Sequence, residues 1–239
     1  MNTINKGSIK VSSRVIGATW LLGFVTYIVG TVLATSILSA PDSLDTIFSH
    51  QTTLAFAAFL MLLTCVLELG KAVLFFPILE NHGKRTALAY LAALIVEVVL
   101  VTIGALGFLM VISLAQQGVD TGAASLIGAK ALGSIAIQWN TMAYQIGEVS
   151  LCIGGVFLCL LLFRSRLIPR FLSVWGVIGY TIFLGGLIAE IFGIHIVSML
   201  EIPGGLFEVT LAFWLLIKGF QPAAYSLSSD APVALTATA

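Results

Sequence analysis

Residues 138–170, QWNTMAYQIGEVSLCIGGVFLCLLLFRSRLIPR, are the stretch that decides the fold. The stretch begins with polar side chains, becomes apolar enough to lie in lipid, and ends with three arginines and a proline. A helix would place a polar stripe on one face, because its members recur at steps of three and four: Gln138, Thr141, Gln145, Glu148 and Cys152. Such a stripe is costly in hydrocarbon unless it faces protein or a water-filled cavity. The stretch therefore predicts a helical membrane bundle with a polar interior.

The composition of the whole chain agrees with this prediction. Hydrophobic residues make up 59% and charged residues 9% of the 239 residues. Soluble domains are roughly half apolar and about a quarter charged. The fold class is therefore all-α, a polytopic protein surrounded by a lipid bilayer, and the formal net charge of +0 gives no indication of a nucleic-acid partner. The 3 cysteines lie in apolar runs without a CxxC pair, which predicts buried thiols rather than a disulfide framework.

Six apolar stretches are long enough to cross about 30 Å of hydrocarbon. They form one transmembrane domain over residues 1–220, with spans at about 15–38, 52–79, 86–114, 138–163, 171–192 and 204–220. Residues 80–85 are expected to be a basic loop and 194–203 a turn, while 121–137 either extend the fourth span or lie at the interface. Residues 221–239 are expected to be a disordered cytoplasmic tail. The four tryptophans fall at or within a few residues of predicted span ends, and interfacial anchoring is expected to account for most of these positions: Trp20, Trp139, Trp175 and Trp214.

The positive charges predict the orientation of the bundle. Lysine and arginine are enriched in the cytoplasmic loops of membrane proteins. If the N-terminus is cytoplasmic, Lys130 lies outside and Lys71 lies within a span. The other basic residues then fall on the cytoplasmic side: Lys6, Lys10, Arg14, Lys84, Arg85, Arg164, Arg166, Arg170 and Lys218. We therefore expect both termini in the cytoplasm.

Five of the six predicted spans contain a glutamate: Glu68, Glu97, Glu148, Glu190 and Glu208. A charged side chain at the centre of a lone membrane helix costs about 2.5–3.5 kcal/mol on insertion scales. We therefore expect these carboxyl groups to converge on one cavity that opens outward. The alternative is that each is protonated, or hydrogen-bonded to a neighbouring helix, and only fixes the helix packing.

Lys71 follows Glu68 at the i, i+3 spacing that pairs side chains on one helix face. Either the two form a structural ion pair, or the lysine lies beside carboxylates in a substrate or proton site. Glu97 and Glu148 lie deep in adjacent antiparallel spans, so we expect them to approach each other and at least one of them to hold a proton near neutral pH. The predicted ligand- or proton-binding residues are Glu68, Lys71, Glu97, Gln145, Glu148, Glu190 and Glu208.

The sequence predicts no catalytic residue and no metal ligand set. No HExxH, GxSxG, Walker loop or Glu-x-x-His pair occurs in a usable context. The cofactor is left open.

Three stretches together resemble an uncharacterised bacterial membrane-protein family, domain of unknown function 4386. They are FPILENHGKRTALAYLAALIVEVVL (76–100), LFRSRLIPRFLSVWGVIG (162–179) and EIPGGLFEVTLAFWLLIKGF (201–220). The pattern S-R-x-x-P-R-x-L-x-x-W-G, from Ser165 to Gly176, is the most specific part. The family's recurring glutamates correspond to Glu97 and Glu208, and the arginine that often precedes the first by three residues is Leu94 here. The resemblance implies a bacterial plasma-membrane (inner-membrane) protein of six helices, and it implies no reaction.

Three functions are compatible with a carboxylate-lined interior. The first is small-solute or proton-linked binding or transport, for which a homo-oligomer or a larger membrane complex is expected. The second is a non-catalytic accessory or structural membrane subunit. The third is an intramembrane enzyme acting on a lipid or quinone, with a glutamate as general acid or base. Because no nucleophile or activated metal is visible, the sequence favours the first over an enzyme.

Overall fold

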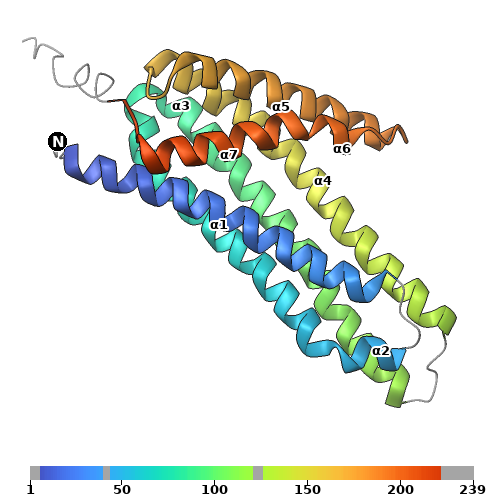
Figure 1. Ribbon diagram of the computed structural model, residues 1–239. Helices are drawn as coiled ribbons and strands as arrows, with labels where there is room; N and C mark the ends of the chain where they lie inside the picture. Colours follow the sequence, from blue (N-terminus) through green and yellow to red (C-terminus); the bar gives the residue numbers. More distant parts are fainter. Residues whose placement is uncertain (1–5, 40–43, 121–125, 222–239) are drawn as a thin grey trace, which may run out of the picture.

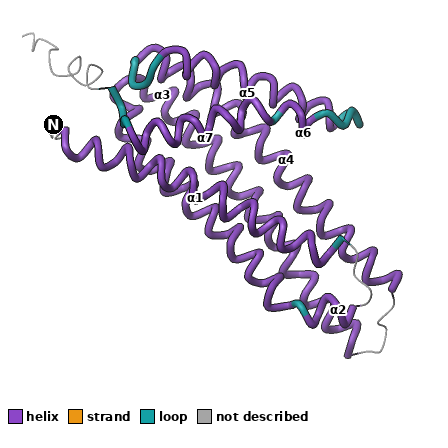
Figure 2. The backbone as a smooth tube through the Cα atoms, viewed as in Figure 1, coloured by secondary structure: helices purple, strands orange, loops and turns teal. Residues whose placement is uncertain are grey.

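The computed structural model describes residues 6–39, 44–120 and 126–221, and this part of the chain is helical without a strand. Figure 2 shows the described chain almost entirely as helix. The fold class is thus all-α, as predicted. The helices are α1 (Lys6–Leu38), α2 (Leu44–Ser49), α3 (Gln51–Asp120), α4 (Leu126–Ser165), α5 (Arg170–Ile191), α6 (Val197–Leu200) and α7 (Ile202–Ile217).

The helix α3 consists of two helical segments that meet at Gly83, where the backbone is non-helical with φ 170° and ψ 82°. In Figure 1, α3 runs from α2 to the opposite end of the bundle, turns, and runs back. The two segments contact each other, because Thr102 donates a hydrogen bond of 3.4 Å to Sγ of Cys65. The predicted spans 52–79 and 86–114 both lie in α3. The predicted loop at 80–85 is helical except at Gly83, and its Asn81 side chain donates to the Pro77 carbonyl (2.8 Å).

Five helices of the described chain are long and apolar enough to cross a membrane: Lys10–Leu38, Gln51–Gln117, Lys130–Ser165, Arg170–Ile191 and Val197–Ile217. The second has 67 residues, more than three times the roughly 20 that one crossing needs, and it contains the turn at Gly83. Two further differences from the sequence expectations are short helices in predicted loops. They are α2 after the first span and α6 between α5 and α7.

The described part of residues 121–137 is helical and continuous with the fourth predicted span. Residues 126–137 are the first turns of α4, so they extend the fourth predicted span. Leu132 and Ala136 pack into a hydrophobic cluster with Leu38 and Phe108, which fixes this extension against α1 and α3. Residues 121–125 lie outside the described part of the chain.

Two hydrophobic clusters hold the bundle together. The larger joins α1, α3, α4, α5 and α7, and includes Phe75, Leu162 and Phe207. The smaller joins α1 to α4 around Ala58 and Phe108. Many large apolar side chains on the outer faces are exposed, which is the surface that a lipid bilayer would cover.

The N-terminal end of α1, the turn of α3, the α4–α5 connection and the C-terminal end of α7 lie at one end of the bundle (Figure 1). Gly83 lies against Leu161 of α4, and the Gln221 backbone N–H donates to the Leu167 carbonyl (2.8 Å). Gly219, just after α7, lies against Ser13 of α1. Of the predicted tail, only Gln221 is described, and residues 222–239 lie outside the described part.

Candidate functional site

The helices α1, α3, α4, α5 and α7 enclose a cavity of about 610 Å³. Four of the five glutamates predicted to converge line this cavity, together with the predicted lysine: Glu68, Lys71, Glu97, Glu148 and Glu208. They come from both segments of α3, from α4 and from α7. Glu201, at the start of α7, adds a fifth carboxyl group to the lining. The described lining therefore contains five carboxyl groups and a single ammonium group.

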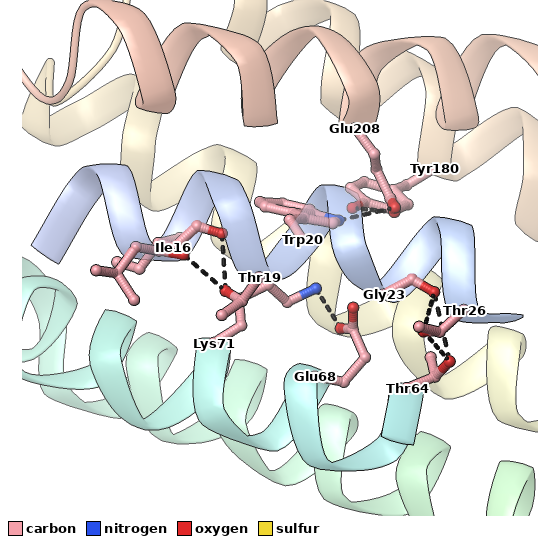
Figure 3. Close-up of polar contacts among 11 residues, drawn as sticks. Ile16, Thr19, Trp20, Gly23, Thr26, Thr64, Glu68, Lys71, Tyr180 and Glu208 are labelled. Carbon is pink, nitrogen blue, oxygen red and sulfur yellow. Dashed lines mark hydrogen bonds and ion pairs between the residues drawn. The ribbon is translucent and has the colours of Figure 1, made fainter. Parts of the chain in front are cut away.

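Glu68 and Lys71 form the ion pair that their spacing predicts (Figure 3). Lys71 is 2% exposed, and its ammonium group lies 4.1 Å from the centre of the Trp20 ring. Gly23 of α1 leaves room for the carboxylate, since a Cβ there would lie 3.0 Å from Oε1 of Glu68. The ammonium group is therefore held between a carboxylate on its own helix and an aromatic face on α1.

Glu208 links three helices through two hydrogen bonds (Figure 3). Nε1 of Trp20 on α1 donates to its Oε2 (3.2 Å), and the Tyr180 hydroxyl on α5 donates to its Oε1 (2.6 Å). Both oxygens of this buried carboxyl group are thus satisfied by protein. Trp20 is an exception to the expected interfacial anchoring of most tryptophans, because its ring is 2% exposed and faces Lys71 and Glu208.

Glu97 and Glu148 are buried, with 7% and 6% of their surface exposed. They face the cavity from the second segment of α3 and from α4. The two helices are close here, since a Cβ on Gly147 would lie 3.5 Å from Cα of Glu97. Oε2 of Glu97 has no hydrogen-bond partner among the described residues, unlike the oxygens of Glu208. Glu97 therefore belongs to the lining of the cavity and has one buried carboxyl oxygen that the described protein leaves unpaired.

Aromatic side chains form another part of the lining. The rings of Tyr27 on α1 and Tyr144 on α4 are stacked, with centroids 5.0 Å apart and planes at 23°. Trp20, Phe24 and Phe183 also line the cavity. The surface offered to a bound molecule is thus partly acidic and partly aromatic.

The polar stripe predicted on α4 is offset by about one residue from the face that lines the cavity. That face contains Asn140, Thr141, Tyr144, Glu148 and Leu151. Gln138 is exposed and Cys152 is part of the hydrophobic core, while Gln145 is half-buried and outside the described lining. Tyr144 and Asn140 lie four and eight residues before Glu148. The spacing of four residues along one helix face is therefore the signal in the sequence that would have identified them as lining residues.

Glu190 is the glutamate that does not converge with the others. Its Oε1 lies 2.6 Å from Nδ1 of His195, and neither residue belongs to the described lining of the cavity. The turn after α5 brings the two together, and Gly193 adopts a φ of +80° within it. The His195 side chain is 79% exposed, so this pair lies at the surface.

The cavity opens between α1, α4 and the first turn of α7. Its exposed lining residues lie there: Ile28, Thr141, Ile202 and Leu206. The start of α7 is fixed to α5 by a hydrogen bond of 3.1 Å from Nε1 of Trp175 to the Pro203 carbonyl. In Figure 1, α7 runs from α6 toward the end of the bundle that contains the α4–α5 connection, so the opening lies at the end of α7 that is farther from this connection.

The donor types do not assemble a metal centre within residues 6–39, 44–120 and 126–221. No group of three or more histidine, cysteine, aspartate or glutamate side chains has the geometry to hold a metal ion there. The three cysteines are free and buried: Cys65, Cys152 and Cys159.

Comparison with known proteins gives a family without an assigned activity. No curated protein and no solved structure matches the chain. Residues 15–219 match the family described as Domain of unknown function (DUF4386), and this range includes every glutamate in the lining of the cavity. Because the match covers most of the sequence, the chain, whose long helices are apolar enough to span a membrane, belongs to this family.

Proposed function

We propose that this protein binds a small solute in the cavity and transports it across the bacterial plasma membrane, linked to protons. The observation that supports this proposal is the convergence of acidic side chains from several helices on one cavity with an exposed opening. Placing several negative charges together in a buried site is costly, and a proton or a positively charged solute offsets that cost. Glutamates that only fixed helix packing would not need an open volume of about 610 Å³ between them.

The proposed topology has six crossings with both termini in the cytoplasm. The reversal of α3 at Gly83 supports two crossings within this helix. The positive charges of 84–85 and 164–170 lie at the end of the bundle that also contains the start of α1 and the end of α7. By the preference of lysine and arginine for the cytoplasm, that end is cytoplasmic and the cavity opens outward. A bundle this small is expected to act as a homo-oligomer or within a larger membrane complex.

The alternative function, an accessory subunit whose buried polar groups only specify packing, has its own support. Glu68 and Glu208 both have protein partners, so these two carboxyl groups serve the packing of α1, α3, α5 and α7. Glu97 has an unpaired oxygen and lines the cavity, and these two observations together favour a bound solute over packing alone.

A cysteine at Thr141 distinguishes these functions. Thr141 is exposed at the opening, and the test replaces the three native cysteines with alanine before Thr141→Cys is introduced. Right-side-out and inverted vesicles are then treated with a membrane-impermeant thiol reagent over a range of pH. If the protein transports a solute, the cysteine at position 141 should be modified from outside and more slowly from inside. The ratio of the two rates should change with pH. His195→Cys serves as the reference thiol, because His195 is exposed and outside the cavity lining.

The same measurement on two glutamate variants tests the proton linkage. Relative to the reference thiol, Glu97→Gln is expected to make the ratio of inside to outside modification at position 141 independent of pH, whereas Glu190→Gln, outside the described lining, keeps the dependence. Modification from outside only, at every pH, would mean binding without transport. A position 141 that stays unmodified from both sides would overturn the proposal and favour the accessory role.

A further inference from the structure

The site around Lys71 shows how this cavity accommodates an ammonium group. The Lys71 ammonium group pairs with the Glu68 carboxylate on one side, and the Trp20 ring lies 4.1 Å away on another. A cation over an aromatic face with a carboxylate beside it is stabilised by both the ring quadrupole and the opposite charge.

The same two kinds of group occur elsewhere in the cavity without a positive charge between them. Tyr144 and Glu148 are one turn apart on α4, so their side chains lie next to each other on the cavity face. Tyr27 stacks on Tyr144 from α1. Glu97 lines the same cavity and is only 7% exposed. Its Oε2 has no hydrogen-bond partner among the described residues. In the described lining, the sole basic side chain is Lys71, which is already paired with Glu68.

We infer that the cavity binds an organic ammonium ion, whose nitrogen lies beside Glu97 and Glu148 and whose apolar part lies against Tyr27 and Tyr144. This inference rests on the proposed function, that the cavity takes a solute, and names the chemical class of that solute. The volume of about 610 Å³ suits a small organic molecule rather than a bare ion. An anion would meet five carboxyl groups and a lysine that is already paired.

The first arm of the test compares three molecules that share one phenyl ring and differ in charge. The full chain in lipid nanodiscs is titrated with 2-phenylethylamine, 2-phenylethanol and phenylacetate, and binding is measured by calorimetry at neutral pH. The inference predicts that the amine binds at least about tenfold more tightly than the alcohol, and that phenylacetate does not bind.

The second arm asks which side chains recognise the amine. Glu97→Gln is expected to weaken amine binding by about tenfold or more, whereas Glu190→Gln leaves it unchanged. Tyr144→Phe keeps the aromatic face and binding within about threefold, whereas Tyr144→Leu removes the face and weakens binding further. The tyrosine pair keeps the inference testable if Glu97→Gln does not fold, as judged by its far-ultraviolet circular dichroism.

The outcomes separate the inference from the proposed function. Equal binding of amine and alcohol, or a loss with Glu190→Gln equal to that with Glu97→Gln, overturns the ammonium class and leaves solute binding standing. No binding of any probe, together with a reactive cysteine at position 141, also overturns the ammonium class alone. No binding together with an unreactive position 141 overturns both.

Discussion

Replacing Lys71 with methionine removes the single ammonium group from the described lining of the cavity while keeping the length of the side chain. Glu68 then loses its ion-pair partner in a site where it is only 12% exposed. Removing one member of a buried ion pair typically costs about 3–5 kcal/mol, because the other charge stays buried and unpaired. Loss of the contact with the Trp20 ring adds roughly 0.5–2 kcal/mol. The cavity has an opening through which water can solvate Glu68, and this lowers the cost of leaving its charge unpaired. We therefore expect Lys71→Met to reduce the free energy of unfolding by about 3 kcal/mol.

The double variant Lys71→Met with Glu68→Gln tests whether this loss comes from the pair. An apolar or neutral replacement of both members of a buried pair is often close to neutral in free energy. The unfolding free energy of the double variant should therefore lie within about 1 kcal/mol of the wild-type value, apart from the loss of the contact with Trp20. It should be more stable than Lys71→Met alone, which is a non-additive result.

The assay is the unfolding free energy in mixed micelles, from a titration with sodium dodecyl sulphate followed by circular dichroism. Lys130→Met is the matched control, because Lys130 is exposed and far from the cavity lining. We expect this control to change the free energy of unfolding by less than about 0.5 kcal/mol. A loss below about 1 kcal/mol for Lys71→Met, or a double variant whose loss equals the sum of the two single losses, would refute the reasoning.

Two further predictions concern packing and topology. Gly17→Ala should destabilise the bundle by about 1–3 kcal/mol in the same titration, because its Cβ would lie 2.5 Å from the Ala212 carbonyl oxygen of α7. Gly185→Ala, with no atom within 4 Å of its Cβ, should be neutral or slightly stabilising, and an equal loss in both variants would contradict the close α1–α7 contact. In intact cells, an impermeant thiol reagent should modify His195→Cys and spare Asn81→Cys, both of which are exposed side chains; the reverse pattern would rule out a cytoplasmic N-terminus.

The helical fold could be predicted from the sequence because apolar runs and their lengths are local properties. The convergence of Glu68, Glu97, Glu148 and Glu208 could also be predicted, since buried carboxyl groups on separate spans need a shared polar interior. Glu190 could not be separated from them by sequence alone. Its position depends on the turn at Gly193, which brings His195 next to its carboxyl group.

Which face of α4 lines the cavity was harder to predict. If the lining residues are chosen by their polarity, Gln145 is favoured over Tyr144. The structure uses Tyr144 because the cavity is partly aromatic, and its ring stacks on Tyr27 of a helix more than 100 residues earlier. The burial of Trp20 inside the bundle could not be predicted for a similar reason. Its position near a predicted span end suggests an interfacial anchor, whereas its partners, Lys71 and Glu208, lie on helices whose arrangement the local sequence does not specify.

Oε2 of Glu97 and Oε2 of Glu190 are both buried and unpaired among the described residues, and Glu97 is the one of the two that lines the cavity. A buried polar group without a hydrogen-bond partner costs about 1–3 kcal/mol, and more if it is charged. If Glu97 served only the packing of α3 against α4, a leucine or alanine would fill its site without that cost. Glu208 shows that this bundle can satisfy a buried carboxyl group completely, with Trp20 and Tyr180 as donors. Glu97 lines an open cavity together with Glu148 and two stacked tyrosines, and this arrangement is better explained by a positively charged partner that binds there and leaves again.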